Sequence, residues 1–157
     1  MKGHIHPIAI AIDKISRIFN DMGFDVVDGP ELEDEWHNFD ALNVPGDHPA
    51  RDMQDTFWIK DKTGVNKHGE GVGYVLCTHT SNMQIRTMEQ VVSKVSERVA
   101  NGEEESSVKG DLFPIAIVCP GKVFRNEATD ATHEAQFHQV EMLYVGKDAS
   151  LSMMIGI

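Results

Sequence analysis

The chain has 157 residues, of which 41% are hydrophobic, and this is enough for one globular domain with its own core. A formal charge of −11 argues against a surface that holds nucleic acid unaided, because phosphate binding draws on clustered Lys and Arg. The N-terminal residues contain no long uncharged apolar segment, so neither a signal peptide nor a membrane span is predicted, and a cytoplasmic protein is expected.

Three elements are predicted in the N-terminal part of the chain. One segment has apolar residues at three- and four-residue spacing and a glycine after it, which indicates a helix. A short alternating run indicates a strand, and aromatic residues at helical spacing indicate a second helix. In chain order these are a helix over Pro7–Met22 ended by Gly23, a strand over Phe24–Val26, and a helix within Glu31–Leu42.

The middle of the chain predicts a hairpin followed by a long helix. Thr56–Ile59 and Tyr74–Cys77 are rich in β-branched and aromatic residues, which favours two strands joined by a hairpin connection. Ser81 and Gln84 have the spacing of a capping box, and an apolar stripe continues from there to about Ala100.

The C-terminal part predicts two more strands. Asn101–Gly110 is polar without periodicity and is predicted to be a linker. Two strands are expected on either side of a polar loop at Ala128–Glu134, and Ser150 could cap a last helix. Helices and hairpins without regular βαβ alternation predict an α+β fold with a mainly antiparallel sheet.

Cysteine and histidine spacing indicates no metal site. Cys77 and Cys119 lie in apolar surroundings without paired-ligand spacing, so we interpret them as reduced core thiols. His4 and His6 stand beside a proline without further ligands at fixed spacing, which is weak support for a metal.

Polar residues alternate along the two C-terminal strands. Alternate residues of a strand share a face, so Arg125 points the same way as Glu127, and Phe137, Gln139 and Glu141 share one face of the returning strand. If the strands pair, one face carries a cation, carboxylates, an amide and an aromatic ring.

An exposed lattice of ion pairs would explain such a face as well as a ligand site would. Leu143 and Val145 continue the stripe with apolar residues, which favours a covered face containing a polar pocket.

Two further segments could contact an anionic ligand. Thr78-His79-Thr80-Ser81, at a strand-to-helix junction, offers hydroxyls and helix N-terminal amides, although simple capping would also explain it. His133 lies in the polar loop, where a lone histidine is more often incidental. Trp58 fits either a core or a pocket wall.

Phosphate-loop, G-x-G-x-x-G and G-x-S-x-G motifs are absent, which argues against P-loop and Rossmann nucleotide binding.

Four segments in this order resemble the catalytic module of the α subunit of phenylalanyl-tRNA synthetase, a class II aminoacyl-tRNA synthetase. They are HPIAIAIDKISRIFNDMGF, GPELEDEWHNFDALNVPGDHPARDMQDTFW, THTSNMQIRTM and PGKVFRNEATDATHEAQFHQVE. The resemblance implies an antiparallel sheet flanked by helices, with residues 1–157 forming an incomplete catalytic domain. The first class motif, a subunit interface, would end at Pro30, and the second would be the hairpin through Arg125 and Phe137, while the third is missing.

The resemblance also implies roles for individual residues. Arg125 resembles the catalytic residue that contacts the ATP α-phosphate and the amino-acid carboxylate. The implied ATP-binding residues are Arg125 at the α-phosphate, Glu127 and Phe137 at the adenine end, and His133 near the outer phosphates. The implied phenylalanine-binding residues are Trp58, His79, Ser81, Gln139 and Glu141.

The implied reaction is activation of phenylalanine by ATP, with Mg²⁺, followed by transfer to tRNA(Phe). The implied partner is the β subunit of the same enzyme, in a hetero-oligomer. Met142 stands where the family has glycine, and Cys77 replaces its arginine before THTS. Because the third motif is missing, the isolated chain is expected to be inactive.

Two other functions stay open at this point. One is a non-catalytic binding or assembly protein that keeps the class II core, which the missing third motif and Met142 would fit. The other is a class II ligase for another acid, which THTS and FHQVE disfavour because they are typical of the phenylalanine enzyme.

Overall fold

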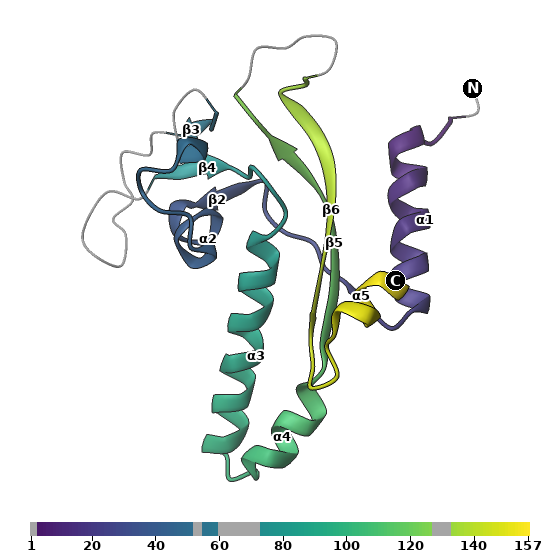
Figure 1. Ribbon diagram of the computed structural model, residues 1–157, viewed down its shortest axis with the longest axis vertical. Helices are drawn as coiled ribbons and strands as arrows, with labels where there is room; N and C mark the ends of the chain where they lie inside the picture. Colours follow the sequence, from purple (N-terminus) through teal and green to yellow (C-terminus); the bar gives the residue numbers. More distant parts are fainter. Residues whose placement is uncertain (1–2, 52–54, 60–72, 127–132) are drawn as a thin grey trace. The chain divides into compact units, whose positions relative to one another are not determined.

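The computed structural model describes residues 3–51, 55–59, 73–126 and 133–157 (Figure 1). They form two compact units, which we describe separately. The first comprises Met1–Val27, Thr87–Val118 and Met142–Ile157, and the second comprises Asp28–Arg86 and Cys119–Glu141. None of the described helices is both long enough and apolar enough to cross a bilayer.

The described elements mix helices with short and long strands. In chain order they are α1 (Pro7–Asp21), β1 (Asp25–Val26), β2 (Leu32–Asp34), α2 (Glu35–Asn38), the 3₁₀ turns η1 (Asp40–Leu42) and η2 (Pro49–Arg51), β3 (Trp58–Ile59), β4 (Tyr74–Leu76), α3 (Asn82–Ala100), α4 (Glu105–Leu112), β5 (Ile115–Phe124), β6 (Gln136–Val145) and α5 (Leu151–Gly156).

Two three-stranded sheets organise these elements. One has the order β1-β5-β6 and the other β2-β4-β3. β2 and β3 both run antiparallel to β4, while β1 pairs with β5 in parallel. The predicted α+β class is therefore confirmed, with one parallel pair added to the antiparallel strands.

The N-terminal predictions are confirmed within the first unit. α1 ends at Asp21, and Gly23 adopts a φ of 90°, the left-handed conformation that glycine takes after a helix. The rings of Phe19 and Phe24 then meet edge to face, with centroids 5.5 Å apart.

The predicted C-terminal cap is also present, because the Ser150 hydroxyl accepts a hydrogen bond of 3.2 Å from the backbone N–H of Met153.

The prediction of a linker over Asn101–Gly110 is wrong, because α4 occupies most of it. Val108 is fully buried and anchors the helix to the core of the first unit. The guanidinium of Arg98 contacts the carboxylates of Glu103 and Asp111, and so joins the end of α3 to the end of α4. One apolar anchor gives no periodicity, so the helix depends on contacts that the local pattern does not show.

The prediction of a helix within Glu31–Leu42 is wrong in its first part. Leu32–Asp34 forms β2, in which Glu33 is 1% exposed, whereas Leu32 is exposed and Asp34 is half-buried. Pairing with β4 turns this carboxylate inward, where Arg86 binds it. The helix that follows is only α2, whose first turn is capped by the Asp34 carboxylate at 2.8 Å from the N–H of His37.

The core of the second unit surrounds this sheet. It contains Phe39, Val75, Cys77, Met83, Cys119 and Val123. Both cysteines are free and buried, which confirms the prediction of reduced core thiols. Burial raises the pKa of Cys77 to about 12 and that of Cys119 to about 11, so both stay protonated and unreactive at neutral pH.

Candidate active site

The polar stripe along β6 lies in the second unit. Phe137, Gln139 and Glu141 are half-buried, whereas the residues between them, Gln136, His138 and Val140, are exposed. The alternation predicted from the sequence is therefore confirmed. A half-buried amide and carboxylate on one face require hydrogen-bonding partners.

Glu141 receives three hydrogen bonds from uncharged donors. The Ser81 hydroxyl and the Gln84 amide donate to Oε2, the latter at 3.1 Å. The Gln139 amide donates to Oε1 at 2.8 Å. No ion pair joins Glu141 to a Lys, Arg or His among residues that the structure describes. The carboxylate is thus fixed in direction and retains part of its capacity for about four hydrogen bonds.

His79 lies close enough to Glu141 for the two to interact electrostatically. Its Nε2 donates to the backbone carbonyl of Asn38 at 2.9 Å, which leaves the lone pair of a neutral ring on Nδ1. Burial lowers the pKa of His79 below its usual 6.5, Arg125 lowers it further, and Glu141 and the Asn38 carbonyl partly oppose the shift. The ring is therefore neutral at pH 7, and Arg125 and Glu141 both act on this one imidazole.

Two buried acceptor atoms beside Glu141 receive no hydrogen bond from any residue that the structure describes. They are Nδ1 of His79 and Oε1 of Gln139. An unpaired buried polar atom costs about 1–3 kcal/mol, so such atoms are expected where a ligand supplies the missing partner. Together with Glu141 they call for a ligand that donates several N–H groups and carries positive charge.

Arg125 follows the end of β5. Its backbone N–H donates to the carbonyl of Ala135 at 3.0 Å, and its guanidinium carbon lies 4.9 Å from the centroid of the Phe137 ring. The side chain is exposed and forms no ion pair with any carboxylate in the described part of the chain. An exposed guanidinium beside an aromatic face can bind a phosphate and leave the ring free to stack on a base.

The remaining predicted site residues are placed less centrally. Trp58 is half-buried, stacks on Phe39 with ring centroids 6.1 Å apart, and donates from Nε1 to the carbonyl of Arg51 at 3.2 Å. His133 is exposed. Glu127 lies outside the described residues. The described geometry therefore brings His79, Ser81 and Gln139 together around the carboxylate of Glu141. Arg125 and Phe137 form a separate pair.

Gln84 belongs to the site, although the sequence indicated only a capping role. Instead of completing a capping box, the side chains of Ser81 and Gln84 both donate to Glu141. Ser81 immediately precedes α3 and Gln84 lies in its first turn, so both can reach the same carboxylate. The spacing was visible in the sequence, but the shared acceptor, which lies 57 positions after Gln84, was not.

Gly121 is a second residue whose role the sequence did not show. A Cβ at this position of β5 would lie 2.6 Å from Cγ2 of Thr80, which is 4% exposed and stands between His79 and Ser81. Only glycine lets the strand and the Thr80 side chain approach so closely.

We expect Gly121→Ala to destabilise the chain by about 1–3 kcal/mol, because the added methyl overpacks a site that has no room. Gly110→Ala is the matched control: it lies inside α4, where a Cβ meets nothing within 4 Å. The control should stabilise by up to about 1 kcal/mol through helix propensity. Urea unfolding of both variants measures the difference, and equal stabilities would refute close packing at Gly121.

A trio of potential metal ligands does not fit a metal ion. Glu33, Asp34 and His37 offer ligand atoms within 4.8 Å of one another. Both oxygens of Glu33 are bound by Arg86, at 2.8 Å from Nε and 2.5 Å from Nη2. The guanidinium already neutralises this carboxylate, so the trio is a structural ion-pair network, and we derive no chemistry from a metal there.

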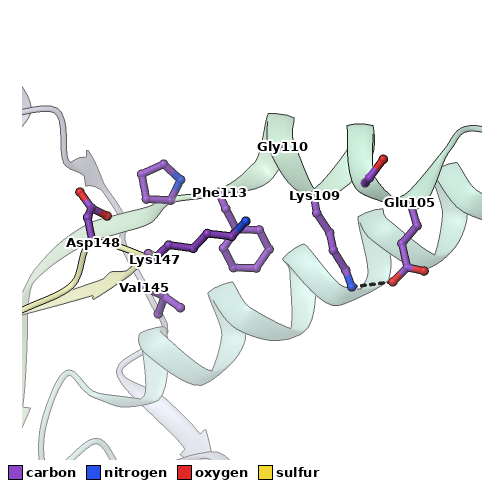
Figure 2. A pocket seen from close by; sticks show the side chains of 10 residues that line it. Glu105, Lys109, Gly110, Phe113, Val145, Lys147 and Asp148 are labelled. Carbon is purple, nitrogen blue, oxygen red and sulfur yellow. Dashed lines mark ion pairs between the residues drawn. The ribbon is translucent and has the colours of Figure 1, made fainter.

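A hollow of about 980 Å³ lies within the first unit, between α4 and the end of β6 (Figure 2). Its walls include Phe113, Pro114 and Val145, and Lys109 on its rim is paired with Glu105 at 2.5 Å. None of the predicted site residues lines it. The candidate active site is therefore assigned to the surroundings of Glu141 and not to this hollow.

The chain matches a known protein family. The family described as the class II core domain of tRNA synthetases (F) matches residues 1–157. The chain belongs to this family. The resemblance found in its motifs is thereby confirmed.

The curated relatives include α subunits of phenylalanine–tRNA ligase. The chain is 42% identical over 149 residues to that of Albidiferax ferrireducens, covering 95% of this chain and 40% of the relative. It is 44% identical over 152 residues to that of a Wolbachia sp. from Drosophila simulans, covering 97% and 36%. It is 43% identical over 150 residues to that of Zymomonas mobilis, covering 96% and 35%. The chain thus spans 35 to 40% of the length of these relatives.

The solved structures include a pyrrolysyl-tRNA synthetase from Desulfitobacterium hafniense. It superposes with a TM-score of 0.56 at 15% identity, covering 88% of this chain and 39% of that one. At this identity the likeness shows the fold, which is that of a class II synthetase.

Proposed function

We propose that residues 1–157 form part of the catalytic domain of a phenylalanine–tRNA ligase α subunit. In the assembled enzyme this part binds phenylalanine and ATP for formation of phenylalanyl-adenylate, and the aminoacyl group then passes to tRNA(Phe). The proposed partner is a β subunit, and the proposed location is the cytoplasm. Support comes from the family, from the names of the relatives, and from the geometry of the site.

The observation that carries the proposal is the carboxylate of Glu141, which three neutral donors hold and which forms no ion pair with any Lys, Arg or His in the described ranges. An α-ammonium group supplies the positive charge and three N–H groups. These can donate to the carboxylate of Glu141, to Oε1 of Gln139 and to Nδ1 of His79. Charge-assisted hydrogen bonds of this kind contribute about twice as much as neutral ones. The amino group of the substrate is therefore proposed to bind here, with Ser81 and Gln84 holding Glu141.

ATP is proposed to bind beside Arg125 and Phe137. The guanidinium of Arg125 would neutralise the α-phosphate and orient the carboxylate of phenylalanine, and the ring of Phe137 would stack on adenine. By position in the family motif, Glu127 is proposed to accept from the adenine amino group and His133 to contact the outer phosphates. Trp58 is proposed to border the bound amino acid.

In the proposed reaction an oxygen of the phenylalanine carboxylate attacks the α-phosphorus of ATP, and the bond to pyrophosphate breaks. The protein supplies no nucleophile. It holds the two substrates in line and neutralises charge on the phosphates. Mg²⁺, which the resemblance implies, would enter with ATP and add to that neutralisation.

Calorimetric titration of phenylalanine into the assembled ligase tests the role of Glu141. Glu141→Gln keeps the size of the side chain but removes its charge, and we expect phenylalanine affinity to fall about tenfold to a hundredfold while ATP affinity is unchanged. Glu103→Gln removes the same charge from an exposed pair with Arg98 in the first unit and should leave both affinities unchanged.

3-Phenylpropionate, which lacks the amino group, completes this test. It should bind the unaltered enzyme and Glu141→Gln equally weakly, because neither can form the ammonium contact. Unchanged phenylalanine affinity in Glu141→Gln would overturn the proposed binding mode.

A further inference from the structure

Asn38, at the C-terminal end of α2, connects to the segment that carries His79. The residue is completely buried. Its side-chain Nδ2 donates to the hydroxyl of Thr78 at 3.0 Å, and its Oδ1 accepts from the backbone N–H of Thr78 at 3.4 Å. Its own backbone carbonyl accepts from Nε2 of His79 at 2.9 Å. One residue therefore contacts two consecutive residues of the site segment through three different groups.

The polar side chain at this position is unusual for a core. Burying an amide costs free energy unless its hydrogen bonds are satisfied, and an apolar residue would fill the same space without that cost. Both hydrogen bonds of the Asn38 amide go to Thr78, so they fix the spacing between α2 and the segment before α3. Phe39, the next residue, stacks on Trp58, so one short segment contacts two predicted site residues.

The contact with His79 decides which ring nitrogen faces the ligand. With Nε2–H donated to the Asn38 carbonyl, Nδ1 carries the lone pair and is the buried acceptor without a donor. A shift of the Thr78–His79 backbone would let the ring turn or exchange tautomers, and the acceptor would be lost.

We infer that Asn38 is a positioning residue for substrate recognition: through Thr78 it holds His79 in the tautomer and direction that accept a hydrogen bond from the substrate ammonium. This role rests on the proposed function, goes beyond the residues named for it, and predicts a selective effect on the amino-acid substrate. ATP, bound beside Arg125 and Phe137, should be unaffected.

Two substitutions of Thr78 provide the sharpest test. Thr78→Val keeps the shape but removes the hydroxyl that accepts from Asn38, and so leaves a buried donor unpaired. Thr78→Ser keeps the hydroxyl. In phenylalanine-dependent pyrophosphate exchange by the assembled ligase, we expect Thr78→Val to raise the KM for phenylalanine about tenfold with the KM for ATP unchanged. Thr78→Ser should restore the KM for phenylalanine.

Asn38→Leu removes both side-chain bonds at similar volume and should raise the KM for phenylalanine further. The matched control is Asn101→Leu, at an exposed turn in the first unit, which should change neither KM. If Asn38→Leu does not fold, the two Thr78 variants still decide the question. Equal behaviour of Thr78→Val and Thr78→Ser, or parallel changes in both KM values, would overturn the inference.

A readout that does not depend on activity separates this inference from the proposed function. Nitrogen chemical shifts of the His79 ring should show an unprotonated Nδ1 in the unaltered protein and mixed tautomers in Thr78→Val. If the unaltered enzyme shows no phenylalanine-dependent exchange, the proposed function fails, and the inferred role in recognition fails with it. If exchange is normal but the ring signals do not differ between the Thr78 variants, the inference alone fails.

Discussion

Replacement of Arg125 by alanine should abolish phenylalanine-dependent pyrophosphate exchange in the assembled ligase, with a loss of at least about a thousandfold in rate. The reason is electrostatic. Arg125 is exposed, stacks on Phe137 and is unpaired by any described carboxylate, so its charge is available to a phosphate. Removing it leaves the charge that develops on the reacting phosphate without its proposed partner.

Two variants make the Arg125 result specific. Arg125→Lys keeps the charge but loses the planar fork and the stacked ring contact, so we expect partial activity between alanine and arginine. Arg98→Ala removes a half-buried guanidinium of the first unit that binds the exposed carboxylates of Glu103 and Asp111, and exchange should stay normal. Normal exchange by Arg125→Ala would show that its charge is not used.

Arg86→Ala should have the largest effect on stability, lowering the free energy of unfolding by about 3–5 kcal/mol. Its partner Glu33 is 1% exposed, and both oxygens of this carboxylate are bound by the guanidinium. After the substitution the charge of Glu33 would stay buried with the amide of Asn82, at 3.1 Å, as its main remaining side-chain partner. Glu33→Gln should cost less, since the partly exposed Arg86 can turn to solvent.

Arg98→Ala serves as the control for this prediction as well. Both arginines lie on α3 and bind carboxylates through Nε and Nη2, but the partners of Arg98 are exposed. An ion pair whose carboxylates lie in solvent contributes little to stability, so the control should unfold at nearly the same urea concentration as the unaltered chain. Equal midpoints for Arg86→Ala and Arg98→Ala would show that burial of Glu33 does not matter.

The candidate site was only partly visible in the sequence. The alternation of Phe137, Gln139 and Glu141 depends on the two-residue period of a strand, and the structure has it. Gln84 was interpreted as half of a capping box, because its true partner belongs to another element. Asn38 gave no signal, since its role depends on a segment that lies 41 positions away in the sequence at His79.

The fold, too, could be predicted from the sequence only in part. Periodicity and turn residues were enough to predict α1 with its glycine, α3, and the capped α5, because these features depend on neighbours within about one helical turn. β2 and α4 could not be predicted from the local sequence, because contacts with distant segments define them. Glu33 turns inward only because Arg86, 53 positions later, neutralises it, and α4 packs on the first unit through Val108, which is fully buried. Local chain geometry repeats along a sequence and can be read from it, whereas the partner of a buried charge is fixed only when distant segments pack together.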